Sequence, residues 1–590
     1  MTFWRRNPAP APHSQSSPET AAPPPRKMLF DTGLRPMTMI MQGMATASRM
    51  FGTSVTSFCD LATCDQHGLL TLNGDYATVL RLRGRRVLGD RSEITSAAAR
   101  LRLEMASLFN DPGHALQFCY AADPDGATHT VARNLDDRRT IARALGAEFE
   151  DIFRERQKIL PGYMRQERTT LVLWTRPGRL SRPELKQANR ERKQAYATLP
   201  PLGDAQNPLL GSQELGTVHS AFVSQVVDAL AFENIVADVL SPQDGLRRIR
   251  EEIYPETVGS EWSACTPADR PPIIIPETDR PADASDMLWP PLREQLFMDD
   301  ALTPDIFTAR LGLYDWRPLE LTRVSEEVRP FTELVSRLAA RRMPWRMTGL
   351  IEGVRPSYMM WKAAVATLLK FGSNTSIYNG FESLKANREA QKDNTVKLRV
   401  SFATCAPAGD TEKLGVRTSR LQQTIGAWGG ASANRMCGDP LAGTLSSVPG
   451  LAIASTAPPT AAPLSEALIM MPWTRPATPW QDGSVLFRAA DGTIVPFDPS
   501  GSGRDARLDL FIGPSRRGKS ALDNVLLLGT LLSPASMTDQ GVRPPMIAKL
   551  DIGDSTSGLI DMVHSAMSAQ DRAQSIHIPF DLIPEHAYNI

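Results

Sequence analysis

A glycine-rich loop near the C-terminal end most strongly constrains how this chain can fold. An apolar run at 508–512 precedes the octapeptide GPSRRGKS, which extends from Gly513 to Ser520, and a largely apolar segment follows at 521–528. A strand, the pattern G-x-x-x-x-G-K-S and a helix in this order are typical of a phosphate-binding P-loop, the Walker A motif. The sequence therefore predicts an α/β fold at this end of the chain.

The residue types in the loop each have a physical role. Gly513 and Gly518 allow backbone conformations that a Cβ would obstruct, so that successive N–H groups can point at phosphate oxygens. A helix that starts near Lys519 adds the positive end of its dipole, and the lysine adds a mobile cation. We therefore expect ATP and Mg²⁺ as cofactors. The predicted nucleotide-binding residues are Gly513, Pro514, Ser515, Arg516, Arg517, Gly518, Lys519 and Ser520, with Arg516 and Arg517 either exposed or in contact with the nucleotide.

Two residues are candidates for contact with the Mg²⁺ ion. The hydroxyl of Ser520 would be a ligand of the nucleotide-bound metal. Asp551 follows a second apolar run, 546–550, at the position that holds a Mg²⁺-associated aspartate in some P-loop proteins. The alternative is that Asp551 ends a strand or caps a helix. No Cys/His spacing predicts another metal site.

Composition excludes several classes of protein. The 590 residues include 65 Lys and Arg and 65 Asp and Glu, so no overall positive field favours nucleic acid or a membrane. The six cysteines include no C-x-x-C pair, and we interpret Cys59 and Cys64 as buried thiols in preference to a disulfide or metal pair. The proline-rich start lacks the apolar segment of a signal peptide, and no transmembrane segment is predicted. A cytoplasmic location is therefore expected.

Patterning along the chain divides it into four regions. We expect a disordered Pro-rich tail at 1–30, an N-terminal α+β domain at 31–270, a second α/β domain with a proline-rich connector at 271–480, and a partial P-loop NTPase domain at 481–590. Alternating apolar residues around Asn73-Gly74 predict a β-hairpin over 68–84. Helices are predicted within 135–158 and over 219–239. No internal repeat is detectable in the sequence.

The segment before the P-loop carries a family resemblance. It reads MPWTRPATPW from Met471 to Trp480, and a short predicted hairpin over 483–492 leads on toward the P-loop. This arrangement resembles the IcmB/TraU branch of the VirB-type conjugation and type IV secretion ATPases. The run DIGDS at 551–555 and the run IPFD at 578–581 are also similar to that family, and the hairpin at 68–84 resembles its N-terminal start. The similarity is strongest over 465–590.

The resemblance implies both a fold and a function. The fold would be multidomain α/β, with mixed α+β N-terminal domains followed by the start of a RecA-like P-loop NTPase domain. The function would be that of a bacterial ATPase subunit that energises apparatus assembly and substrate transfer in type IV secretion or conjugal transfer. Partners would be other subunits of the apparatus and further copies of the chain, with peripheral contact at the inner membrane. Direct contact with DNA is left open.

The chain departs from the family pattern after the P-loop. Only 83 residues extend from Leu508 to Ile590, whereas motor domains of this family continue for several hundred, so we expect the Walker B and catalytic residues to lie beyond Ile590. No catalytic residue is assigned, and only nucleotide binding is carried over, to the loop from Gly513 to Ser520. The alternative function is a non-hydrolysing scaffold or truncated fragment that binds nucleotide or partner subunits.

Overall fold

The computed structural model describes most of the chain from residue 54 onward. The residues outside the description are 1–53, 88, 198–201, 203–204, 270–287, 299–300, 325–327, 355–385, 387–392, 479, 481, 500–509, 515–516, 535–536, 539–540, 543–544, 551–556, 568–571 and 573–590. The tail predicted at 1–30 and the candidate residues Ser515, Arg516 and Asp551 therefore lie outside the described residues. All described residues belong to one compact unit.

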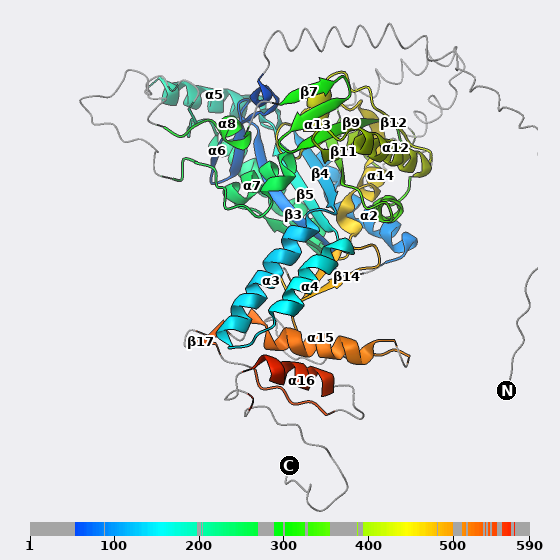
Figure 1. Ribbon diagram of the computed structural model, residues 1–590. Coiled ribbons are helices and arrows are strands. Elements are labelled where there is room, and N and C mark those ends of the chain that lie inside the picture. The colour runs from blue at the N-terminus through cyan, green and yellow to red at the C-terminus, as the bar shows by residue number, and fades with distance from the viewer. Residues whose placement is uncertain are drawn as a thin grey trace, which may run out of the picture. The chain divides into compact units, whose positions relative to one another are not determined.

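One large antiparallel sheet dominates the described residues (Figure 1). Its main path is β1–β2–β3–β5–β4–β10–β11–β9–β8–β7, with β6 beside β3, β12 beside β9 and β13 beside β11. The strands are β1 (Leu61–Asp65), β2 (Gly68–Thr71), β3 (Tyr76–Arg85), β4 (His114–Asp123), β5 (Gln166–Thr175), β6 (Ile235–Val239), β7 (Leu302–Asp305), β8 (Thr308–Leu311), β9 (Tyr314–Arg323), β10 (Trp345–Gly353), β11 (Thr395–Pro407), β12 (Ser432–Asn434) and β13 (Thr460–Pro463). The predicted mixed α/β class and the hairpin at Asn73-Gly74, which joins β2 to β3, are confirmed.

Helices pack on both faces of this sheet. Apolar side chains of α2, α6, α9, α12 and α14 meet one face, and those of α7, α8 and α13 meet the other. The helices are α2 (Arg91–Met105), α3 (Ala127–Ala144), α4 (Glu150–Ile159), α5 (Arg182–Tyr196), α6 (Gln213–Phe232), α7 (Pro242–Ile253), α8 (Leu292–Leu296), α9 (Phe331–Ala339), α12 (Thr411–Ala427), α13 (Pro440–Ser446), α14 (Leu464–Ile469), α15 (Lys519–Leu531) and α16 (Ser557–Ala566). The sheet is thus the middle layer of three.

A structural repeat generates the sheet. The first repeat contains β1–β2–β3–α2–β4–β5–α6–β6–α7, and the second contains β7–β8–β9–α9–β10–β11–α12–β12–α13 in the same order. The sheet order reverses between β4 and β10, which pair antiparallel, so the two repeats are related by an approximate two-fold axis through this central pair. The sequence contains no repeat that we detected, because the two copies share a pattern of burial and turns more than residue identities.

Irregular features recur at matching places in the two repeats. The register shifts between Leu82 and Gly84, where β3 pairs with β6, and it shifts at the corresponding place where β9 pairs with β12. The Asp65 side chain accepts a hydrogen bond from the backbone N–H of His67 at 2.7 Å, and Asp305 accepts one from Phe307 at the same distance. β-Bulges and Asx turns are specific local features that tend to stay at the same place in a given fold. Their recurrence supports a duplicated scaffold.

Two predicted helices differ from the structure. The helix expected within 135–158 is two helices, α3 and α4, and the chain between them contains Gly146 in a left-handed conformation at φ 66°. The helix expected over 219–239 ends at Phe232, where Asn234 takes a positive φ of 59°. Residues 235–239 then form β6, because pairing with β3 at the sheet edge overrides local helix propensity.

Helix α6 is long and apolar enough to span a bilayer by length and composition, and it is the one such helix among the described residues. Its buried residues Phe222, Val226 and Leu230 belong to the core between the helices and the sheet. This packing accounts for the apolar composition of α6.

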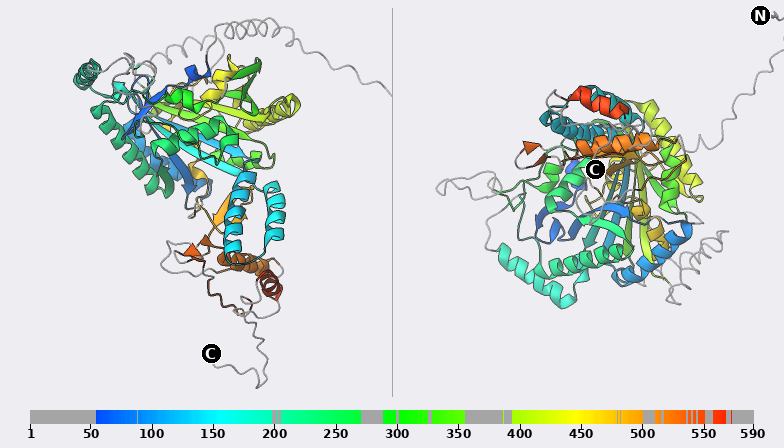
Figure 2. Two further views of the ribbon diagram at one scale, coloured as in Figure 1. Left: turned by 60° about the vertical axis from the view of Figure 1, so that its left-hand side comes forward. Right: turned by 90° about the horizontal axis from the view of Figure 1, so that it is seen from below.

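A pair of helices, α3 and α4, lies between β4 and β5 in the chain, and the two run side by side (Figure 1, Figure 2). Their apolar side chains form a separate core with residues of α15 and α16. Two ribbons, β14 (Val485–Arg488) with β15 (Ile494–Phe497) and β16 (Met537–Thr538) with β17 (Gly541–Val542), flank α15 in the sequence.

Substitution of Gly349 tests the packing between β4 and β10, where the two repeats meet. Gly349 lies on β10 directly opposite Phe118 of β4, and a Cβ at this position would overlap the Phe118 ring. Gly349→Ala is expected to lower the free energy of unfolding by about 1–3 kcal/mol through overpacking. A Cβ at Gly415 in α12 has its nearest neighbour at 3.9 Å, so Gly415→Ala should stabilise by about 0.5–1 kcal/mol. Urea unfolding of both variants measures this; equal effects would contradict the assigned register.

Candidate functional site

The described residues of the P-loop, which are exposed apart from the half-buried Gly513, lead into α15. Gly518 adopts a left-handed conformation with φ 86°, and α15 begins at the next residue, Lys519. A Cβ at Gly518 would meet nothing within 4 Å, so the backbone conformation rather than space requires the glycine here. Gly513 has no positive φ, and a Cβ there would lie in ordinary contact with Lys519, so the same role predicted for Gly513 is not seen.

Lys519 closes the loop on itself. Its Nζ donates hydrogen bonds to the carbonyl oxygens of Gly513 at 2.7 Å and Pro514 at 3.0 Å. The ammonium group thus lies near the exposed N-terminal end of α15. Arg517 and Ser520 are exposed as well. A ligand phosphate could replace the two carbonyls as the partner of the ammonium group, because an anionic acceptor makes the stronger hydrogen bond.

The strands predicted on either side of the loop are not present in the described residues. Residues 510–512 and 545–550 belong to no strand, and the side chains of Leu510, Ile512, Met546 and Leu550 are largely exposed. Both predictions are therefore wrong for this part of the chain. The physical reason is that a parallel strand is stable only when neighbouring strands and helices cover it. Lys549 holds the second segment near α15 through Asp523 at 2.5 Å.

The P-loop helix is supported from its far end. Leu528, Leu531 and Leu532 pack into the core that α3 and α4 provide. Gly529 lies so close to β14 that a Cβ would overlap Val485. Apolar packing along the C-terminal half of α15 therefore holds the helix, and with it its N-terminal end, in position.

Arg138 of α3 ties this support together. Its guanidinium is buried and donates hydrogen bonds to the carbonyl oxygen of Leu532 at 2.8 Å and that of Gly483 at 3.2 Å. Leu532 follows the last residue of α15, where a cation also opposes the negative end of the helix dipole. Burial lowers the pKa of Arg138, which agrees with a charge surrounded by carbonyl groups and few ion partners.

An ionic network anchors the ribbon that precedes the loop. Arg475 contacts Glu167 of β5 at 2.9 Å and Asp491 at 2.6 Å, and Arg165 contacts the same two carboxylates. Burial alone would raise the pKa of Asp491, but Arg475 and Arg165 lower it to about 2. Arg475 lies in the proline-and-tryptophan segment, so this network joins that segment to the main sheet.

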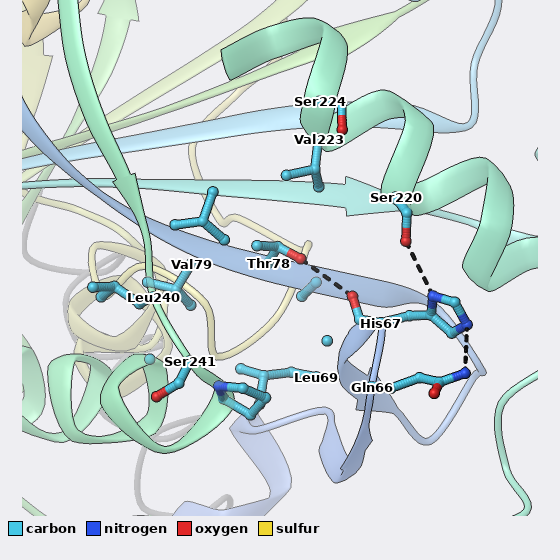
Figure 3. A pocket seen from close by; sticks show the side chains of 15 residues that line it. Gln66, His67, Leu69, Thr78, Val79, Ser220, Val223, Ser224, Leu240 and Ser241 are labelled. Carbon is cyan, nitrogen blue, oxygen red and sulfur yellow. Dashed lines mark hydrogen bonds between the residues drawn. The ribbon is translucent and has the colours of Figure 1, made fainter. Parts of the chain in front are cut away.

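A pocket of about 260 Å³ lies on the first repeat, between β2, β3, α6 and the start of α7 (Figure 3). His67 Nδ1 is 3.0 Å from the Ser220 hydroxyl, and the Gln66 amide is 3.2 Å from His67 Nε2. Because the amide donates to Nε2, Nδ1 carries the proton and donates to Ser220, which is the reverse of a general base. Asp65 accepts hydrogen bonds from the His67 backbone and the Tyr76 hydroxyl instead of orienting the imidazole.

A buried polar chain continues behind this pocket. Thr78, which lines it, hydrogen-bonds His219 at 2.8 Å, and His219 hydrogen-bonds Thr175 at 2.8 Å. Burial lowers the pKa of His219 to about 3, so the ring is neutral at physiological pH. The groups satisfy one another, and we assign them a structural role. Sequence reasoning missed this pocket because His67 and Ser220 are far apart in the chain.

Three of the predicted site residues, Ser515, Arg516 and Asp551, lie outside the described residues, so the predicted metal contact of Asp551 stays a prediction. Within the described residues, no group of three His, Cys, Asp or Glu could hold a metal ion. Cys59 and Cys64 are free buried thiols, as predicted, and burial raises the pKa of Cys59 to about 12.

The sequence matches no protein-family model and no curated protein.

Replacement of Arg138 tests the support of the P-loop helix. Arg138→Ala leaves the carbonyls of Leu532 and Gly483 without this donor. It should lower the free energy of local unfolding of α15 by about 1–3 kcal/mol. Amide hydrogen exchange over 519–531 should accelerate accordingly. Arg143→Ala, at an exposed position on the same helix, is the matched control and should leave that exchange unchanged. Unaltered exchange in Arg138→Ala would contradict the assigned support.

The Asp491 network predicts a dependence on pH. Because the pKa of Asp491 is lowered to about 2 from 3.8, its stabilising effect is complete above about pH 4 and is lost as the pH falls toward 2. Asp491→Asn should therefore lower the free energy of unfolding by about 1–2 kcal/mol at pH 7. Below pH 4, the difference in this free energy between the variant and the wild type should shrink. Urea unfolding across this pH range measures the difference. Asp136→Asn, at a carboxylate that is 65% exposed in its ion pair with Arg139, should change the free energy of unfolding little at any pH.

Proposed function

We propose that the chain is the nucleotide-binding ATPase subunit of a bacterial type IV secretion or conjugal transfer apparatus. The observation that carries the nucleotide part is the conjunction of Gly518, Lys519 and α15: a left-handed glycine, a lysine ammonium folded over the loop, and an exposed helix N-terminus. These are the groups that bind phosphate in P-loop proteins. The machine itself is proposed from the resemblance of the segment 465–590.

The described residues fit MgATP in their chemistry. The free N–H groups at the start of α15 and the Lys519 ammonium offer donors to the β- and γ-phosphates, and Ser520 offers an oxygen to the metal. Bound Mg²⁺ would supply charge neutralisation between the phosphates. Lys519 would then exchange the carbonyls of Gly513 and Pro514 for phosphate oxygens, which couples binding to a change of the loop.

Peripheral docking at the inner membrane, a cytoplasmic location and self-association belong to the same proposal. They rest on the resemblance alone. A RecA-like domain is likewise proposed for the region around α15. Its parallel sheet would need strands beyond those found in the described residues, since 510–512 and 545–550 are unpaired there.

A second candidate is a scaffold that binds nucleotide without hydrolysing it. The exposed, unpaired segments beside the P-loop favour this candidate, because hydrolysis requires an acidic residue and a positioned water held on neighbouring strands. No described residue occupies that role. The two candidates share the nucleotide site and differ in turnover.

Nucleotide binding and turnover by the purified chain provide the test. Binding of a fluorescent ATP analogue with Mg²⁺ should weaken at least about tenfold in Lys519→Ala, which removes the cation from the loop. The matched control is Lys158→Ala, which removes an exposed lysine from α4 and should bind as the wild type does.

Steady-state phosphate release separates the two candidates. Turnover that Lys519→Ala abolishes supports the ATPase, and Mg²⁺-dependent binding without turnover supports the scaffold. Equal binding by wild type and Lys519→Ala, or the absence of binding in both, would overturn the assignment of a P-loop site.

A further inference from the structure

A basic groove lies on the second repeat, between the end of α9 and the first turns of α12. It encloses about 400 Å³, which is within the range of pockets that hold small molecules. Its cationic lining consists of Arg341, Arg342, Lys413, Arg417 and Arg420. Within the described part of the chain, none of these five side chains forms an ion pair.

The carboxylates in the groove do not neutralise this charge. Asp410 accepts a hydrogen bond from the backbone N–H of Lys413 at 3.0 Å and so caps α12. Glu412 is exposed on the first turn of the same helix. Five cations against two carboxylates in a concave surface concentrate a positive potential, which attracts anions.

Two of the arginines are fixed by the fold. Arg417 is buried and donates to the carbonyl oxygen of Cys405 at 2.6 Å. Arg342 donates to the carbonyl oxygens of Pro161 and Met164 at 3.0 and 3.3 Å, and it does so from a positive φ of 42°, which other residue types adopt more readily. The charges of Arg341, Lys413 and Arg420 have no comparable structural partner in the described residues.

The first repeat provides an internal comparison. Alignment of Leu414-Gly415 in α12 with Leu215-Gly216 in α6 also aligns the buried Thr418 with the buried His219. Lys413 then corresponds to Glu214, and Arg420 to Ala221.

The segment before the central strand of each repeat, β4 or β10, shows a similar difference in charge. The chain between α2 and β4, residues 106–113, contains no lysine or arginine, whereas the corresponding stretch of the second repeat contains Arg341 and Arg342. The same junction thus folds without these cations in the first repeat. Folding alone does not account for the presence of Arg341 in the second, whereas Arg342 has the carbonyl oxygens of Pro161 and Met164 as structural partners.

We propose that this groove binds a small molecule that carries a polyphosphate group. Several cations around one cavity match a compact anion with several charges, and guanidinium groups bind phosphate oxygens through paired hydrogen bonds. The volume exceeds what a single inorganic phosphate fills. The site is independent of the P-loop, which lies on another part of the chain.

Tripolyphosphate is the probe, measured by isothermal titration calorimetry at 0.15 M salt. Every protein carries Lys519→Ala, so that the P-loop does not contribute its lysine. The groove variant is Lys413→Glu with Arg420→Ala, which installs the residues of the first repeat and should therefore fold. Arg341→Ala is a second variant that alters the other wall. The matched control, Lys186→Glu with Arg190→Ala, makes the same change of charge at exposed positions of α5.

The expected result is one binding site that weakens at least about tenfold in both groove variants and is unchanged in the control. Absence of binding in the parent, or equal affinity in parent and groove variants, overturns the proposal. Binding of a single-stranded oligonucleotide through these residues, without affinity for tripolyphosphate, also overturns it, because the groove would then be a nucleic-acid surface. ATP binding compared between wild type and Lys519→Ala reports on the P-loop separately.

Discussion

The pairing of β4 with β10 is the constraint on which the rest of the structure depends. Both strands are buried on both faces, so every polar group on them needs a partner inside the protein. Arg346 on β10 meets this demand at the interface of the repeats. It donates to the carbonyl oxygen of Glu252 at the end of α7, to the Ser447 hydroxyl at 2.7 Å and to the carbonyl oxygen of Thr444 in α13 at 3.1 Å, and its guanidinium lies 4.1 Å from the Trp316 ring. One buried charge thus joins corresponding helices of both repeats.

Neighbouring charges keep this centre ionised. Burial alone would raise the pKa of Glu252, but Arg168 and Arg248 lower it below its ordinary value. Arg168 contacts the Glu252 carboxylate at 2.9 Å. A buried ion pair of this kind adds little net stability, but loss of one partner is costly because the other charge remains. The two repeats are therefore held in one relative position by a network that tolerates little change.

The two repeats share a scaffold in their interior and differ where they face solvent. The interior is constrained by the shared sheet, whereas the loops and first helical turns are free to diverge. At corresponding turns the first repeat has His67 and the second has Phe307, and at corresponding helix starts the first has Glu214 and the second has Lys413. The pocket at His67 and the basic groove at Lys413 are products of this divergence. In the first repeat, α3 supports the P-loop helix through Arg138.

The sequence by itself determined the local features. G-x-x-x-x-G-K-S predicted unusual backbone conformations at Gly513 and Gly518 followed by a helix, of which Gly518 and the helix are seen, and Asn73-Gly74 predicted a hairpin. Each of these features depends on the conformational preferences of a few adjacent residues. Tertiary structure alone decided the rest: β6 in place of a helix, the break at Gly146, the unpaired segments around the P-loop, the repeat, and the grouping of Arg341 with Lys413 and Arg420. These features depend on which distant segment supplies the partner for a strand edge or an apolar face, and no local pattern of residues specifies that partner.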